Sequence, residues 1–172
     1  EHPDDILDLL MEHHSIDIQW GNHDILWMGA TAGSDACIAT TIRNNIQYNN
    51  MQMLENGYGI SLRTLTLFAE RLYPDMEPMK AALKAISVIL FKLEGQIISR
   101  HPEYNMDDRR LLHKINYENG TIEIEGKTYE MNDVNFPTVD RKNPYELSSE
   151  EKQLVKELRR MYVNNKRLKQ HI

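Results

Sequence analysis

The sequence contains a single cysteine, Cys37, so no intrachain disulfide can form. The disulfide scaffolds of small secreted proteins are therefore excluded, and a reducing cytoplasm is the simplest location for the protein. Cys37 lies among Ala36, Ile38 and Ala39, as packed helix cysteines do, and this argues against a nucleophilic role.

Long apolar runs and an excess of positive charge are also missing. No stretch approaches the roughly 20 apolar residues that cross a membrane, and no signal peptide is visible. The 172 residues carry a net charge of −6, which argues against non-specific binding to nucleic acid or anionic membranes. Hydrophobic residues make up 41% of the chain, an ordinary share for a globular protein with a substantial core. We expect neither a nucleic acid nor a membrane as a partner.

Most of the chain has the spacing of amphipathic helices. The helix with the widest apolar stripe is expected to be the central core helix, and Ser148-x-x-Glu151 is a capping box at the start of the last helix. The predicted helices cover residues 4–13, 34–48, 61–73, 78–99 (the widest stripe) and 148–172, with a short one over 107–114.

Only a few segments have the pattern of strands. Ile16–Trp20 alternates apolar and polar residues, which predicts a short strand with one face buried. Ile115–Tyr117 and Thr121–Glu125 flank an Asn-Gly turn, and the chain turns again at Gly126, which predicts a small antiparallel hairpin. The expected fold class is α+β, mainly helical.

Three polar residues, Asn22, His23 and Asp24, follow the predicted strand and Gly21, and an apolar helix begins after them. This order places them at the carboxyl edge of a sheet, where open α/β sheets gather reactive groups. An Asn carbonyl is a ligand for Mn²⁺ or Mg²⁺, a His can protonate a leaving alkoxide, and an acid can orient that His. The alternative is a turn in which Asn22 caps a helix and His23 is a surface residue. Spacing alone does not decide between them.

Gly21-Asn22-His23-Asp24 is similar to the Gly-Asn-His-Asp/Glu motif of the calcineurin-like metallophosphatases. The wider segment His14–Ala30 resembles, more narrowly, the class III fructose-1,6-bisphosphatases of bacteria. The resemblance covers about residues 1 to 140 and continues, in the same order, through Tyr58–Arg63, Phe91–Ile98, Asn105–Leu112 and Gly126–Tyr129.

The resemblance implies an activity and a role for each residue of the motif. The activity is hydrolysis of fructose 1,6-bisphosphate to fructose 6-phosphate and phosphate, a step of gluconeogenesis, by a metal-activated hydroxide. Asn22 is expected to be a ligand of a dinuclear Mn²⁺ centre. His23 is expected to act as acid or charge stabiliser, with Asp24 as its orienting partner. Arg43 is a candidate substrate-binding residue that would contact a phosphate, or else a solvated helix residue.

Other motifs of this family are not found in the sequence. The Asp-x-His strand, the Gly-Asp-x-x-Asp-Arg-Gly loop and two downstream histidine ligands are all missing. We therefore expect an internal piece of a longer enzyme, inactive alone because one Asn ligand cannot hold two metal ions. The expected parts are a piece of the metallophosphatase α/β sandwich with one core strand and a flanking helix (1–30), a helical insertion with the hairpin (31–131), a linker (132–147) and an amphipathic helix (148–172).

Two other functions stay open at this point. A different metallophosphatase, acting on phosphoproteins or dinucleotides, would share only the Gly-Asn-His-Asp core. A non-enzymatic helical interaction module would fit the missing ligands, and exposed apolar surface would then favour self-association.

Overall fold

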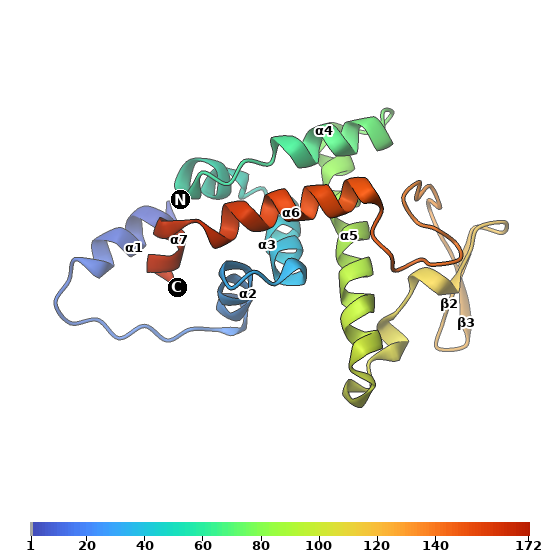
Figure 1. Cartoon of the computed structure of the whole chain (residues 1–172), viewed down its shortest axis with the longest axis horizontal. Coiled ribbons are helices and arrows are strands. Elements are labelled where there is room, and N and C mark those ends of the chain that lie inside the picture. The colour runs from blue at the N-terminus through green and yellow to red at the C-terminus, as the bar shows by residue number, and fades with distance from the viewer. Residues whose placement is uncertain (1) are drawn as a thin grey trace. The chain divides into compact units, whose positions relative to one another are not determined.

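A computed structural model describes residues 2–172 of the chain. The chain divides into two compact units, a first unit of Glu1–Ile86 with Gln153–Ile172 and a second unit of Ser87–Lys152. The elements labelled in Figure 1 are helices, apart from a small antiparallel sheet. The helices are α1 (Pro3–Met11), α2 (Asn22–Thr31), α3 (Asp35–Gln47), α4 (Arg63–Leu72), α5 (Pro78–Arg100), α6 (Ser149–Val163) and α7 (Lys166–His171), and the strands are β1 (Ile115–Asn116), β2 (Thr121–Ile124) and β3 (Lys127–Glu130). The mainly helical α+β class is confirmed.

Four predicted helices form within a few residues of their expected bounds, as α1, α3, α4 and α5. Local signals account for their ends. The Ser34 hydroxyl accepts a hydrogen bond from the Cys37 amide at 3.4 Å and so caps α3, while Pro78 occupies the first position of α5, where it costs no hydrogen bond.

The core of the first unit forms around the packing of α2 against α3. A Cβ at Gly29 of α2 would lie only 2.6 Å from the Cys37 sulfur of α3, so glycine permits this close approach. Tyr162 of α6 is fully buried in the same unit, with its hydroxyl 3.0 Å from the Thr41 hydroxyl. Other buried side chains of this core are Ala30, Ile38, Ile42, Leu54, Ile60, Leu65 and Phe68.

The second unit joins the carboxyl half of α5 to the sheet and to the beginning of α6. The strands pair in the order β1-β2-β3, all antiparallel, with Thr121 opposite Glu130 and Ile124 opposite Lys127. Glu125 and Gly126 connect β2 to β3 with φ angles of 50° and 73°, the left-handed pair that a tight hairpin turn requires. The predicted hairpin is therefore confirmed.

Three local predictions are wrong. Ile16–Trp20 forms neither strand nor helix, because no described strand lies beside it to complete its backbone hydrogen bonds, and Ile18 and Trp20 stay 60% and 61% exposed. Residues 107–114 form two separate 3₁₀ turns, Asp107–Arg109 and Leu112–Lys114, in place of one helix. The last predicted helix is broken after Val163, and Asn165 caps the separate helix α7.

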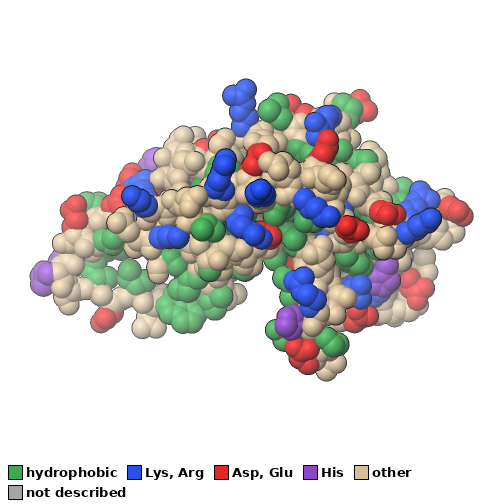
Figure 2. Space-filling view, in the orientation of Figure 1, with side chains coloured by type: hydrophobic (Ala, Val, Ile, Leu, Met, Phe, Trp, Pro, Cys, Tyr) green, Lys and Arg blue, Asp and Glu red, His purple; other side chains and the backbone are tan. Residues whose placement is uncertain are grey.

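Within residues 2–172, no helix combines the length and the apolar character needed to cross a bilayer. Figure 2 shows a row of Lys and Arg side chains along α6 and α7. Several of these cations are paired: Arg159 forms an ion pair with Asp35, and Arg167 donates to Asp4, Asp5 and Asp8.

Candidate active site at the amino end of α2

The Gly-Asn-His-Asp motif forms the beginning of α2. Gly21 is the N-cap residue, and Asn22, His23 and Asp24 make up the first helical turn. The Asp24 carboxylate accepts a hydrogen bond from the Gly21 amide at 2.7 Å. A carboxylate in this place satisfies an otherwise unpaired amide and interacts favourably with the helix dipole. The three polar residues thus begin a helix, and the structure ties Asp24 to the backbone of the motif.

Asn22 and His23 are exposed to solvent. Neither side chain has a hydrogen-bond or ion-pair partner among residues 2–172. His23 lines a small hollow of about 200 Å³ together with Asn44, Asn45 and Tyr48. The histidine ring is therefore available to an incoming ligand.

The described residues do not by themselves form a metal centre. No group of three or more His, Cys, Asp or Glu side chains in this part of the chain is close enough to hold a metal ion. Asn22 offers one amide oxygen, which fits a single coordination position of Mn²⁺ or Mg²⁺ but not a complete site.

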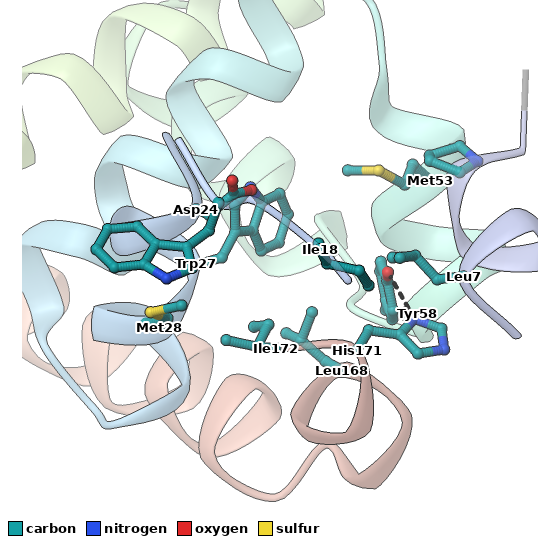
Figure 3. A pocket seen from close by; sticks show the side chains of 12 residues that line it. Leu7, Ile18, Asp24, Trp27, Met28, Met53, Tyr58, Leu168, His171 and Ile172 are labelled. Carbon is teal, nitrogen blue, oxygen red and sulfur yellow. Dashed lines mark hydrogen bonds between the residues drawn. The ribbon is translucent and has the colours of Figure 1, made fainter. Parts of the chain in front are cut away.

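A second cavity, of about 410 Å³, adjoins the motif at Asp24. Figure 3 shows Asp24, Trp27 and Met28 of α2 on one side of it and Leu7, Tyr58 and His171 on the other. The walls are largely apolar, with Trp20 and Met53 contributing further surface. Asp24 therefore lies at the boundary between the motif and an aromatic-rich cavity.

A hydrogen-bonded network holds one wall of this cavity. His171, whose side chain is 1% exposed, lies between the Asp8 carboxylate, 2.6 Å from its Nε2, and the Tyr58 hydroxyl, 3.0 Å from its Nδ1. Hydrogen bonds from Arg167 and His171 lower the pKa of Asp8, while burial raises the pKa of Tyr58. The members of this network are far apart in the chain, and the only signal for it in the sequence is that α1 is acidic and α7 is basic.

Arg43, the predicted substrate-binding residue, lies on α3 and is partly buried. It lines neither of the two hollows beside the motif. The structure thus brings Asn22, His23 and Asp24 together within one helical turn and does not place Arg43 with them.

Comparison with known proteins identifies relatives along the whole chain. The protein-family model described as "Firmicute fructose-1,6-bisphosphatase" matches residues 1–172. Fructose-1,6-bisphosphatase class 3 1 of Clostridium beijerinckii is 49% identical over 98% of this chain and 28% of its own length. Fructose-1,6-bisphosphatase class 3 of Alkaliphilus metalliredigens is 47% identical over 99% of this chain and 29% of its own. The chain thus spans less than a third of the length of these relatives, and no solved structure matches it.

Proposed function

Because the chain belongs to the Firmicute fructose-1,6-bisphosphatase family, we propose that it is part of an enzyme that hydrolyses fructose 1,6-bisphosphate to fructose 6-phosphate and phosphate. The observation that carries the proposal is the match to class 3 relatives, which extends over 98% of the chain. A phosphoprotein or dinucleotide phosphatase would share only the four-residue motif at Gly21–Asp24. The length of the match therefore favours the sugar bisphosphate as substrate.

Each residue of the motif has a proposed role. Asn22 contributes one oxygen ligand to Mn²⁺ in the complete enzyme, and residues outside this segment supply the rest. When bound, the metal supplies an activated water and neutralises phosphate charge. The exposed His23 ring donates a proton to the leaving oxygen or stabilises negative charge there.

Asp24 acts as a positioning residue in this proposal. Its hydrogen bond to the Gly21 amide fixes the first turn of α2 and therefore the backbone from which Asn22 and His23 project. The family resemblance assigns it to support His23, and a role through the shared helical turn is compatible with that assignment.

We further propose that the complete enzyme contains the α/β sandwich expected of this family and that other parts of it cover the segment Ile16–Trp20. Ile18 and Trp20 are exposed in the described residues, so this segment offers apolar surface to such a cover. The exposed side chains Ile6, Leu9 and Met11 of α1 add to this uncovered apolar surface. In the absence of such a cover, the same surface would promote self-association.

Substitution of the motif in the complete enzyme tests the proposed activity. Asn22→Ala and His23→Ala are expected to lower phosphate release from fructose 1,6-bisphosphate with Mn²⁺ by about 10²- to 10⁴-fold, since each removes a group that acts on the reacting phosphate. The matched controls are Asn132→Ala and His14→Ala, which remove exposed side chains of the same types. Activity that is equal in the motif and control variants would contradict the assignment.

Competing substrates test the choice of substrate class. The unsubstituted enzyme is expected to hydrolyse fructose 1,6-bisphosphate with a higher kcat/KM than a phosphopeptide or a dinucleotide. A preference for either of the latter would overturn the sugar bisphosphate and leave the metallophosphatase motif intact.

A further inference from the structure

The second unit carries a basic hollow at the carboxyl end of α5. Its volume is about 560 Å³, and its lining residues all lie within Ser87–Lys152. Three cationic side chains line it, namely Arg100, Arg110 and Lys142, against a single acidic one, Glu146. Figure 2 shows Lys and Arg side chains over the lower part of α5.

Arg110 is held in a fixed orientation. Its Nη1 donates to the Asp107 carboxylate at 2.8 Å, and its guanidinium lies 4.6 Å from the centre of the Tyr145 ring. The Nε of Arg110 is buried and has no hydrogen-bond partner in the part of the chain that the structure describes. Nη2 of the same guanidinium forms no hydrogen bond within residues 2–172 and is not buried, so it is the donor that an acceptor in the hollow can reach.

Tyr145, on which Arg110 stacks, is itself firmly placed. Its hydroxyl lies 2.7 Å from His113 Nδ1, and its carbonyl accepts a hydrogen bond from Gln96 at 2.7 Å. Burial raises the pKa of Tyr145 and lowers the pKa of His113, which favours a hydroxyl that donates to a neutral imidazole. The ring occupies the space above Gly95, where an added Cβ would lie 2.1 Å from Cδ1. The wall behind Arg110 is therefore rigid.

Asp107 offsets the charge of Arg110, but the other two cations that line the hollow have no acidic partner in the described part of the chain. The side chains of Arg100 and Lys142 have no hydrogen-bond or ion-pair partner among the residues that the structure describes. Glu146 lies 3.1 Å from the Lys152 ammonium, which offsets its charge. In a chain of net charge −6, this local concentration of cations favours an anionic ligand.

We propose that this hollow binds the phosphate group of a small phosphate monoester, with Arg110, Arg100 and Lys142 as its cationic donors. The fixed Arg110 guanidinium would donate to one phosphate oxygen through Nη2, and the two flexible cations would neutralise the remaining negative charge. Ser99 and Asn143 line the same space and offer neutral donors. A volume of about 560 Å³ suits a small molecule. This proposal does not depend on the reaction proposed above.

Calorimetric titration of the full-length protein tests the site. The probes are inorganic phosphate and glycerol 1-phosphate, and acetate serves as a carboxylate for comparison. The titrations use the Asn22→Ala variant in the presence of a metal chelator, so that phosphate does not bind at the Gly-Asn-His-Asp motif. One phosphate is expected to bind per chain, and acetate about tenfold more weakly or not at all. Arg100→Ala/Lys142→Ala is expected to weaken phosphate binding by about tenfold or more.

A matched pair of substitutions separates a specific site from a general effect of charge. Lys156→Ala/Arg160→Ala removes the same two charges from exposed positions on α6 and is expected to change phosphate binding by less than about twofold. Arg110→Lys keeps the charge but loses the planar donor that Asp107 and Tyr145 hold in place, and it is expected to weaken binding by about tenfold.

Three results would overturn the proposal: no saturable binding of either phosphate probe, equal weakening by the two double variants, or unchanged binding by Arg110→Lys. Arg100 and Lys142 are exposed, so the double variant should fold, and it tests the site even if Arg110→Lys does not fold. Activity on fructose 1,6-bisphosphate is measured separately with Mn²⁺, so failure of this site and failure of the proposed reaction are distinguishable.

Discussion

At the scale of single residues, Lys92 and Glu151 form a buried ion pair in the second unit. Their side chains are 0% and 1% exposed, and the Lys92 ammonium lies 2.7 Å from Glu151 Oε2. Lys92 also donates to the Thr138 carbonyl at 2.6 Å, and Glu151 accepts a hydrogen bond from the Ser148 amide at 2.7 Å. The pair therefore joins α5, the irregular segment around Thr138 and the beginning of α6. Both charges are satisfied, as burial of ions requires.

Lys92→Met is expected to lower the free energy of unfolding by about 3–5 kcal/mol, because it leaves Glu151 buried without a counter-ion. Lys92→Met/Glu151→Gln should recover part of this loss, since no buried charge remains. The control Lys152→Ala removes an exposed ion pair with Glu146 and should cost about 1 kcal/mol or less. Urea denaturation measures all three, and a cost for Lys92→Met as small as that of the control would contradict the role of the pair.

Gly95 gives a second prediction at this scale. Replacing glycine by alanine inside a helix normally stabilises it by about 1 kcal/mol. Gly95→Ala should instead destabilise the protein by about 1–3 kcal/mol, because the new methyl group would collide with the Tyr145 ring. The control is Ser99→Ala, an exposed position on the same helix. Thermal denaturation shows whether Gly95→Ala raises or lowers the stability. An increase would mean that the Tyr145 ring moves away at little cost.

At the scale of elements, α7 shows how a short helix depends on what it contacts. Asn165 caps it by accepting a hydrogen bond from the Leu168 amide at 3.0 Å, and its side-chain amide donates to the Tyr58 carbonyl at 2.6 Å. Arg167 and His171 then bond to the Asp8 carboxylate of α1. A helix of six residues has little stability of its own, so these contacts hold it in place.

The contact between α1 and α7 is expected to depend on pH. The pKa of Asp8 lies below its ordinary value of 3.8 because of hydrogen bonds from Arg167 and His171. The stabilisation that comes from its ionised form is thus present above about pH 4 and is lost as the pH falls through the lowered value. Hydrogen exchange of the α1 amides should therefore accelerate, relative to the intrinsic exchange rate, as the pH falls below about 4.

A substitution checks the origin of this pH effect. Arg167→Met should accelerate exchange in α1 already at neutral pH and flatten its dependence on pH, whereas Arg160→Met on the exposed face of α6 should do neither. The same acid response in Arg167→Met as in the unsubstituted protein would show that other carboxylates cause it.

At the scale of the whole molecule, metal binding is expected to differ between this 172-residue chain and the complete enzyme. Residues 2–172 contain no cluster of three metal-binding side chains, and Asn22 offers one oxygen. Mn²⁺ is therefore expected to leave the thermal midpoint of the 172-residue chain unchanged and to raise the midpoint of the complete enzyme. At a free Mn²⁺ concentration of a hundred times the dissociation constant, the complete enzyme should gain about 2.7 kcal/mol in free energy of unfolding. Two Mn²⁺ ions bound by this chain alone, observed by calorimetry, would contradict the proposed division of ligands.

Much of the fold follows from short-range patterns in the sequence. Apolar spacing and end signals are local, so α1, α3, α4, α5 and the hairpin form near their expected bounds. The exceptions depend on partners. Ile16–Trp20 alternates like a strand, but a strand needs a neighbour to pair with, and none lies beside it in the described residues. The long predicted helix over 148–172 ends at Val163, and Asn165 leaves the helical conformation to cap α7 through its side chain.

The sequence by itself determined the family of the protein and the order of its motif, since Asn22, His23 and Asp24 are adjacent and their pattern needs no knowledge of folding. Only the tertiary structure decided which distant charges meet: Lys92 with Glu151, Asp8 with His171, and the cations at the end of α5. The physical reason is range. Backbone propensity and capping act over a few residues, whereas the pairing of buried charges is set by how helices pack, and no local pattern records that packing.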